Sequence, residues 1–424
     1  FRLRVLDDGL FIVAAAREYR QHIGAEVVAF GETNAAAAVV ATRGLLHAEN
    51  DYSARLLAAD RLALPAVLEH LQLIEDPSRV ALTLARDGKT QTITIKPLGP
   101  GAEVEIVGPT FPSAPLARRH RDQSKWHAQV PGESAWYIKV DEIEQFPTVL
   151  LADFIADALA QARQAGARRL LLDLRDNHGG TSSFNPAIVN ALGRSEFNQW
   201  GRLYVLVGRE TLSAASRLMS ALEQYTAVIF VGEPSGAQPS SFGDPRRIQL
   251  PNSGLTLRSS TLAWPSWLAG EFREYIETHL DAPVTSVDYF AGRDVAIEAA
   301  LGYSPPASPV AQMAELFEKD KLQAGLLRFL GWLNAPVDGT HDAVGELLTY
   351  GHRYLDASEL KKGRFMMVLA RDFYPTSVNA RTGLGRAMEL NGDPESARER
   401  YQEALALDPD NVAAKGALKR LGER

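Results

Sequence analysis

Strand-like and helix-like segments alternate along the middle of the chain. Continuous apolar runs of strand length fall at residues 135–143, 169–174, 202–207 and 227–231. The segments between them have helix-like patterns and cover residues 148–165, 186–192 and 213–225. Buried strands separated by helices predict an α/β domain with a layered sheet, and they place any chemistry at the carboxyl ends of its strands.

The first 98 residues mix strand and helix patterns. Gly9–Ala16 is a strand-like apolar run, and Val80–Ile95 alternates β-branched residues on both sides of an Asp-Gly pair, which is typical of a β-hairpin. Leu45–Leu73 is mostly helical in pattern. We therefore expect an α+β module over residues 1–98 with a helical insertion. Its order of elements resembles a PDZ-like domain, which implies binding of substrate C-termini by strand addition; a plain α+β packing domain is the alternative.

Two further blocks follow this module. Residues 99–131 are rich in proline, glycine and charge, which is typical of a linker. The α/β domain is predicted at residues 132–303, and an all-α segment at residues 308–424. We expect one helix over Leu316–Leu333 to join the last two blocks.

The all-α segment repeats with a period of 34 residues. The repeating positions are Gly351, Tyr354, Ala370 and Pro375 in one copy, and Leu384, Gly385, Ala397, Tyr401, Ala404 and Pro409 in the next. The spacing resembles the tetratricopeptide repeat, in which small residues let two helices pack closely. Because two repeats are few for a solenoid, we expect this segment to pack on the α/β domain or on a second subunit, which leaves a homo-oligomer open. The repeats also predict a protein partner.

Composition narrows the classes of function. The net charge of −7 gives no reason to expect nucleic acid or an anionic membrane as partner. The chain has no cysteine, which excludes disulfides, thiol catalysis and cysteine-ligated metal. No apolar run is long enough to span a bilayer. The chain starts at Phe1 without a signal peptide, so we expect that an N-terminal segment was removed or never present, and that the protein is periplasmic or secreted.

Two motifs carry the candidate chemistry. Asp173–Gly180 (DLRDNHGG) is a strand end running into a glycine turn, and Thr211–Ser216 (TLSAAS) puts a serine at the start of a helix. A helix N-terminus offers unpaired N–H groups and a positive dipole, and a Gly-Gly turn lets a second backbone approach closely. Together they are the parts of a nucleophile and its oxyanion hole.

These motifs resemble the tail-specific, or C-terminal processing, serine peptidase family. Five motifs of the family occur in the expected order. They are DLRxNxGG at Asp173–Gly180, TxSAxS at Thr211–Ser216, VGEP at Val231–Pro234, LPNSGLTL at Leu250–Leu257 and AGRD at Ala291–Asp294. The similarity extends from about Trp136 to Leu301. The resemblance implies a ClpP/crotonase-like layered α/β fold and a serine peptidase activity on a peptide or protein substrate.

The resemblance also assigns roles within the site. Ser213 matches the nucleophile, with a helix-capping serine as the alternative. Ala214 would offer one oxyanion N–H, and Gly179 or Gly180 the other. Asp173 and Arg175 are expected to form a buried ion pair that organises the turn.

The general base is the open point. Counting from the VGEP motif, Gln238 stands where the family has a lysine, and glutamine cannot accept the proton. A related branch of the family uses a histidine from an upstream segment, which here would precede Phe1. Within the chain, His178, His127 and His47 are candidates, and His178 is favoured because it adjoins the oxyanion glycines.

The sequence therefore predicts a serine peptidase that acts through an acyl-enzyme on Ser213. The alternative is an inactive homologue that serves as a peptide- or protein-binding scaffold. No cofactor is expected, because there is no phosphate-binding glycine loop. No metal is expected, because no histidine pair has ligand spacing.

Overall fold

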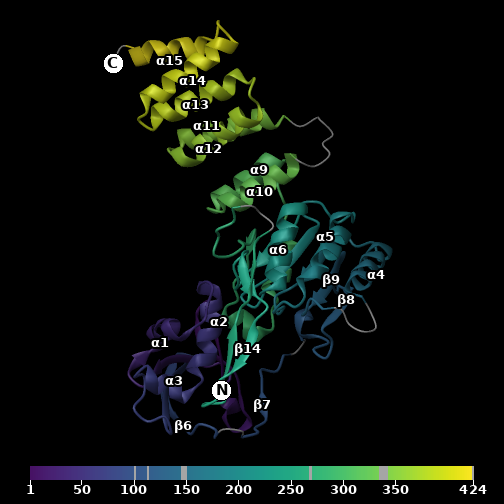
Figure 1. Cartoon of the computed structure of the whole chain (residues 1–424), viewed down its shortest axis with the longest axis vertical. Helices are drawn as coiled ribbons and strands as arrows, with labels where there is room; N and C mark the ends of the chain where they lie inside the picture. The colour runs from purple at the N-terminus through teal and green to yellow at the C-terminus, as the bar shows by residue number, and fades with distance from the viewer. Residues whose placement is uncertain (100–101, 112–113, 145–149, 267–269, 334–341, 423–424) are drawn as a thin grey trace. The chain divides into compact units, whose positions relative to one another are not determined.

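The computed structural model describes residues 1–99, 102–111, 114–144, 150–266, 270–333 and 342–422 (Figure 1). The chain divides into two compact units, Phe1–Ser304 and Pro305–Arg424. Strands dominate the first unit and helices make up the second, which confirms the predicted mixed α/β class with an all-α C-terminal segment. Among the described helices, none has both the length and the apolar composition needed to cross a membrane.

A six-stranded sheet forms the centre of the first unit. Its order is β17-β12-β11-β10-β9-β8, and all neighbours are parallel except β8 and β9. The strands are β8 (Lys125–Gln129), β9 (Ala135–Val140), β10 (Arg169–Asp173), β11 (Leu203–Val207), β12 (Ile229–Gly232) and β17 (Leu280–Asp281). The helices around it are α4 (Leu151–Gln164), α5 (Asn185–Gly193), α6 (Ala214–Tyr225), α7 (Ser286–Ala291) and α8 (Val295–Gly302).

Both faces of this sheet are buried, which explains its continuous apolar strands. Leu170 and Leu172 pack into one core with α4, α5 and α6, which lie together in Figure 1. Leu171 points to the opposite core, which α8 covers. The carboxyl ends of β9, β10, β11 and β12 therefore meet at one edge of the sheet, which is the expected place for chemistry.

The predicted elements of this domain are present with small shifts at their ends. The helix expected over 148–165 is described from Leu151, and residues 145–149 lie outside the described part of the chain. The expected linker, residues 99–131, is more structured than predicted. It supplies β7 (Ile106–Val107), which pairs with β2, and β8, whose Trp126 is buried against the sheet.

The N-terminal module is an antiparallel sheet with helices packed on it. The path β1-β2-β3-β5-β6 is extended by β4 on β3 and β7 on β2. The elements are β1 (Arg2–Leu6), β2 (Gly9–Ala16), β3 (Glu26–Phe30), β4 (Thr33–Asn34), α1 (Ala35–Ala41), α2 (Asp51–Leu62), α3 (Pro65–His70), β5 (Val80–Arg86) and β6 (Lys89–Ile95). Asp87 and Gly88 join β5 to β6 at φ +51° and +72°, as a type I′ hairpin turn requires. Whether the module is PDZ-like stays a prediction.

Hydrogen bonds tie the module to the α/β domain. The Asp7 N–H donates to the Val284 carbonyl at 3.0 Å. At the start of α2, the Asn50 side-chain amide donates to the carbonyls of Ser235 (3.0 Å) and Glu274 (2.9 Å). The helical insertion is thereby fixed beside the loop that follows β12.

Short elements complete the first unit. They are β13 (Ser241–Gly243), β14 (Arg246–Gln249), β15 (Thr256–Ser259), β16 (Leu262–Trp264), η1 (Arg17–His22), η2 (Thr42–Leu45), η3 (Leu116–Arg118) and η4 (Ser182–Phe184). Between β12 and β17, β14 pairs with β15 and the flanking β13 pairs with β16, and the described residues contain four short 3-10 helices.

Paired helices make up the second unit. They are α9 (Pro309–Glu318), α10 (Leu322–Leu333), α11 (Ala343–Asp356), α12 (Leu360–Phe373), α13 (Val378–Leu390), α14 (Pro394–Leu407) and α15 (Val412–Gly422). A Cβ added at Gly385 would lie 2.7 Å from the Tyr401 ring, and one at Gly351 would lie 2.7 Å from Met367. These glycines therefore let the two helices of each pair touch, as the repeat pattern predicts.

One prediction in this unit was wrong. A single helix was expected over Leu316–Leu333, but the chain forms α9 and α10 with a break between them. Asp320 adopts φ +57°, a left-handed conformation that ends a helix. The short polar stretch Lys319–Lys321 supplies this turn.

Candidate active site

Asn177 shapes the loop that follows β10. Its side-chain amide donates to the Val140 carbonyl at 2.9 Å, and its Oδ1 accepts from the Gly179 N–H at 2.8 Å. Its own carbonyl accepts from the Leu212 N–H at 3.0 Å. The Asn177 side chain is fully buried, so every one of these bonds forms away from water. One residue thus joins the end of β9, the glycine turn and the segment before α6.

Ser213 lies directly before α6 in a strained backbone conformation. Its φ of +51° and ψ of −122° are unusual for a residue with a side chain. The residue is exposed, and its hydroxyl does not cap the helix. Two positions earlier, the buried Thr211 hydroxyl donates to the Leu174 carbonyl at 2.8 Å and so holds this segment against the loop after β10. The predicted helix-capping role of Ser213 is therefore not what the geometry shows.

The structure brings the glycine turn against Ser213. A Cβ added at Gly179, whose φ is +109°, would lie 2.6 Å from Ser213 Cβ and 2.9 Å from the Ala214 nitrogen. The Gly179 N–H already donates to Asn177. Within the described residues, the N–H groups of Gly180 and Ala214 have no acceptor. Of the two glycines considered as oxyanion donors, Gly180 is therefore the one with a free N–H.

A buried ionic network supports the loop from below. Asp173 pairs with Arg175 at 2.7 Å, and Arg175 also pairs with Asp294 at 2.7 Å. Burial alone would raise the pKa of Asp173, but Arg175 and Lys139 outweigh it and hold this pKa well below its usual range. The expected Asp173–Arg175 pair is confirmed, and Asp294, from the AGRD motif, completes it.

Lys139 is part of the same network and is not available as a base. It is buried on β9 and contacts Asp176 at 2.7 Å and Asp141 at 3.0 Å. Burial lowers the pKa of Lys139, but Asp173 and Asp176 outweigh this and leave the pKa raised. A lysine that stays charged cannot accept the serine proton.

None of the candidate bases is hydrogen-bonded to the Ser213 hydroxyl within the described residues. His178 Nε2 lies 3.2 Å from Glu210 Oε2, and this hydrogen bond raises the pKa of His178. His127, on β8, contacts Asp157 of α4 at 3.2 Å. His47 is exposed in the loop before α2.

Gln238 is held by the helical insertion. Its N–H donates to Glu49 Oε2 at 2.8 Å, and its side-chain amide donates to the Glu49 carbonyl at 3.2 Å. The Gln238 loop also touches the segment before Ser213, since a Cβ added at Gly236 would lie 2.9 Å from the Leu212 side chain. His47 lies two residues before Glu49 in the same loop.

Sequence reasoning missed Glu210 and Glu49. Each contacts a predicted site residue, but neither lies in a motif that the family resemblance covers. A carboxylate three residues before the nucleophile was a usable signal for Glu210. Glu49, 189 residues from its partner, left no such signal.

Among the described residues, no group of three or more histidine, aspartate or glutamate side chains is placed to hold a metal ion. The groups that the site does offer are a serine hydroxyl, free backbone N–H groups and imidazole.

Comparison with known proteins identifies one repeat and several peptidases. The tetratricopeptide repeat matches residues 378–421, which confirms the prediction for that segment. No curated protein matches the chain in sequence. Among solved structures, mature CPAF is 11% identical and covers 76% of this chain and 82% of its own, with a TM-score of 0.47.

Two further structures are similar to the chain. A candidate peptidase from Parabacteroides merdae is 20% identical over 42% of this chain and 64% of its own, with a TM-score of 0.34. The photosystem II D1 C-terminal processing protease is 13% identical over 72% of this chain and 78% of its own, with a TM-score of 0.31. The chain thus spans just under two thirds of the first protein.

Proposed function

We propose that this protein is a serine peptidase that hydrolyses peptide bonds through an acyl-enzyme on Ser213. One observation carries the proposal: an exposed serine in a strained conformation at the N-terminus of α6, in direct contact with a glycine turn. Strain of this kind costs about 1–3 kcal/mol and persists where it has a use. Here the serine adjoins Ala214, whose N–H is free, and lies against the turn that carries the free N–H of Gly180.

The reaction follows from this geometry. Ser213 Oγ bonds to the substrate carbonyl carbon while its proton passes to a base. The N–H groups of Gly180 and Ala214 stabilise the oxyanion, and the α6 dipole adds to their effect. The C–N bond then breaks, and the amine leaves with the proton. Water, activated by the same base, hydrolyses the ester and restores the Ser213 hydroxyl.

His178 is the base in this proposal. Glu210 contacts its Nε2, which leaves Nδ1 to accept a proton, and the raised pKa increases its basicity. Glu210, His178 and Ser213 supply the three kinds of group that a catalytic triad uses, and the proposal requires Nδ1 of His178 to reach Ser213 Oγ in the complex with substrate. His47 is the competing base, supported by the contacts of Glu49 with Gln238.

The alternative function is a non-catalytic binding scaffold. One observation favours it. Gln238, which stands where the family has its lysine base, is hydrogen-bonded to Glu49. In that case Ser213 would be unreactive although it is exposed.

A serine-reactive fluorophosphonate separates these possibilities. We expect it to label the wild-type chain and not Ser213→Ala. His178→Gln should lower the labelling rate by about 100-fold, the lower end of the contribution of a general base, while His47→Gln labels as the wild type. The reverse order of the two histidine variants would assign the base to His47. A wild-type chain that does not react would favour the scaffold.

We further propose that the repeats of the second unit bind a protein partner and that the protein works in the periplasm or outside the cell. The repeat match over residues 378–421 supports the first proposal. The absence of cysteine from the sequence is compatible with the second.

A further inference from the structure

An arginine-lined cleft lies in the first unit, beside the candidate active site. It has a volume of about 780 Å³ and lies between β1, α2 and the segment that leads to η3. The cleft contains six arginines and two carboxylates. The arginines are Arg2, Arg4, Arg55, Arg118, Arg121 and Arg209, and the carboxylates are Asp60 and Glu210. For a chain with a net charge of −7, this is a local reversal of sign.

Several of these arginines lack a carboxylate partner. Within the described residues, Arg2, Arg55 and Arg121 form no ion pair, and all three are exposed. The Arg118 guanidinium lies 4.7 Å from the Phe111 ring and 4.5 Å from the Tyr289 ring. Stacking fixes the plane of a guanidinium while its N–H edge stays free for an anion.

Two of the arginines in the cleft are already paired. Arg4 lies 3.6 Å from Glu210, and Arg209 pairs with Glu233 and donates to the Val5 carbonyl at 2.6 Å. The unpaired side chains therefore leave a net positive potential, and low-dielectric walls concentrate it.

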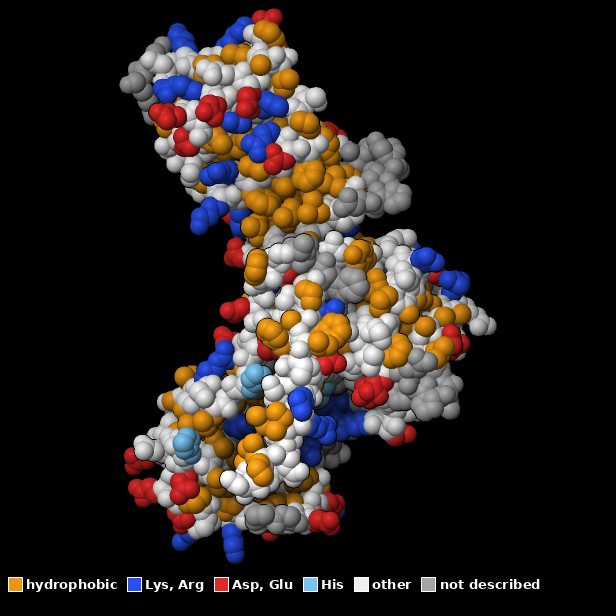
Figure 2. Space-filling model, in the orientation of Figure 1, with side chains coloured by type: hydrophobic (Ala, Val, Ile, Leu, Met, Phe, Trp, Pro, Cys, Tyr) orange, Lys and Arg blue, Asp and Glu red, His pale blue; other side chains and the backbone are white. Residues whose placement is uncertain are grey.

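The cleft reaches the candidate active site through Glu210. This side chain lines both the cleft and an adjoining hollow of about 430 Å³, and it also contacts His178 beside the glycine turn. β1, which borders the cleft, is at one end of the sheet order and so presents a strand edge. Figure 2 shows Lys and Arg side chains gathered in a hollow near β14.

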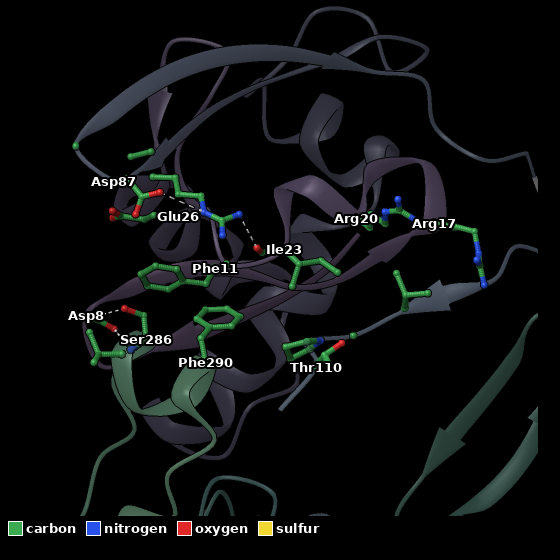
Figure 3. A pocket seen from close by; sticks show the side chains of 18 residues that line it. Asp8, Phe11, Arg17, Arg20, Ile23, Glu26, Asp87, Thr110, Ser286 and Phe290 are labelled. Atoms are coloured by element: carbon green, nitrogen blue, oxygen red, sulfur yellow. Dashed lines mark hydrogen bonds and ion pairs between the residues drawn. The ribbon is translucent and has the colours of Figure 1, made fainter. Parts of the chain in front are cut away.

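A larger cavity offers a contrast. It has a volume of about 1030 Å³ and lies between the module and α7 (Figure 3). There, Arg86 donates to the carbonyls of Gln21 and Ile23, and Asp8 accepts from Ser286. Several of its polar groups are thus satisfied by the protein itself, whereas Arg2, Arg55 and Arg121 of the arginine cleft form no ion pair within the described residues.

We propose that the arginine cleft binds an acidic segment of a polypeptide substrate and delivers the adjoining residues to Ser213. Guanidinium groups bind carboxylates with paired N–H donors, and a strand edge suits an extended chain. Catalysis of such a substrate rests on the proposed peptidase function, but binding does not. A single-stranded nucleic acid, the other anionic chain, does not offer the backbone groups that pair with a strand edge.

Binding is measured on the full-length Ser213→Ala protein, so that its result is independent of catalysis. The probe is a fluorescein-labelled peptide in which glutamate alternates with glycine and serine, and its affinity is measured by fluorescence anisotropy at low ionic strength. The reference peptide has glutamine in place of glutamate. We expect the glutamate peptide to bind more tightly than the glutamine peptide by about tenfold or more. Because salt screens charges, we expect this ratio of the two affinities to fall as salt is added.

Matched variants locate the site. Arg55→Gln/Arg121→Gln should weaken binding of the glutamate peptide by about tenfold, roughly threefold for each exposed charge pair. Arg61→Gln/Arg79→Gln, which removes the same charge from exposed arginines outside the cleft, should leave it unchanged. Equal affinity for both peptides, an equal loss in both double variants, or tighter binding of an oligodeoxythymidine would overturn the proposal.

Discussion

Replacing Gly179 with alanine would test the contact on which the candidate active site depends. The added Cβ would lie 2.6 Å from Ser213 Cβ, about 1 Å closer than carbon atoms normally approach. It would also lie 2.9 Å from the Ala214 nitrogen and 3.1 Å from the Leu212 carbonyl oxygen, so the whole segment has to move. A shift of about 1 Å in a reacting group costs about 100-fold in rate.

The cost in stability has two parts. A φ of +109° is unfavourable for alanine by about 1–3 kcal/mol, and the overlap adds about 1–3 kcal/mol. We therefore expect the free energy of unfolding to fall by roughly 2–6 kcal/mol. Gly166→Ala is the matched control, since Gly166 has φ +68° and nothing within 4 Å of its added Cβ. Gly166→Ala should lower the free energy of unfolding by only about 1–2 kcal/mol. Replacing glycine with alanine also restricts the unfolded chain, and this effect is the same in both variants.

Two measurements check this reasoning. Urea unfolding followed by tryptophan fluorescence gives the free energy of unfolding, and the fluorophosphonate labelling rate reports the geometry of Ser213. Gly179→Ala should be slower in labelling and less stable than Gly166→Ala. If the two variants matched in both measurements, the close approach of the glycine turn to Ser213 would be refuted.

Two further predictions concern the pH dependence and the repeats. Glu210 raises the pKa of His178, and a base must be neutral to accept a proton, so the labelling rate should increase with pH through a pKa above 6.5. Glu210→Gln should move this increase to lower pH. An unchanged pH profile in this variant would exclude the pairing of Glu210 with His178. In the second unit, the side chain of Gly385→Leu would collide with the Tyr401 ring. The unfolding temperature of the repeats, measured by calorimetry, should fall, while the labelling of Ser213 should stay unchanged. A parallel loss of labelling would show that the two units depend on each other.

The strands of the α/β domain were predictable because strands buried on both faces have apolar residues at consecutive positions. Leu170, Leu171 and Leu172 fill both cores, so the run is apolar without alternation. The position of Ser213 could be predicted for a similar reason, since the start of a helix is a local property. Its positive φ could not, because the segment before Ser213 is held by hydrogen bonds of Thr211 and Asn177 that join it to another loop, and a local pattern does not contain such bonds.

The contacts of the polar site residues were harder to predict. His178 adjoins Gly179 in the sequence, but its ring pairs with Glu210, and neighbouring positions do not determine where a side chain points. Gln238 meets Glu49 only because Asn50 fixes the insertion beside the loop after β12. Interactions between residues so far apart depend on the packing of whole elements, which the pattern of one segment does not contain.

The pairing of Arg175 with Asp294 has a consequence for the timing of synthesis. The two residues are 119 positions apart, so a ribosome adding about 5–20 residues per second makes Asp294 roughly 6–24 s after Arg175. During that interval the loop beneath Ser213 has only part of its ionic support. A nascent chain therefore carries its serine long before the site around it is assembled, which delays any cleavage until the domain is nearly complete.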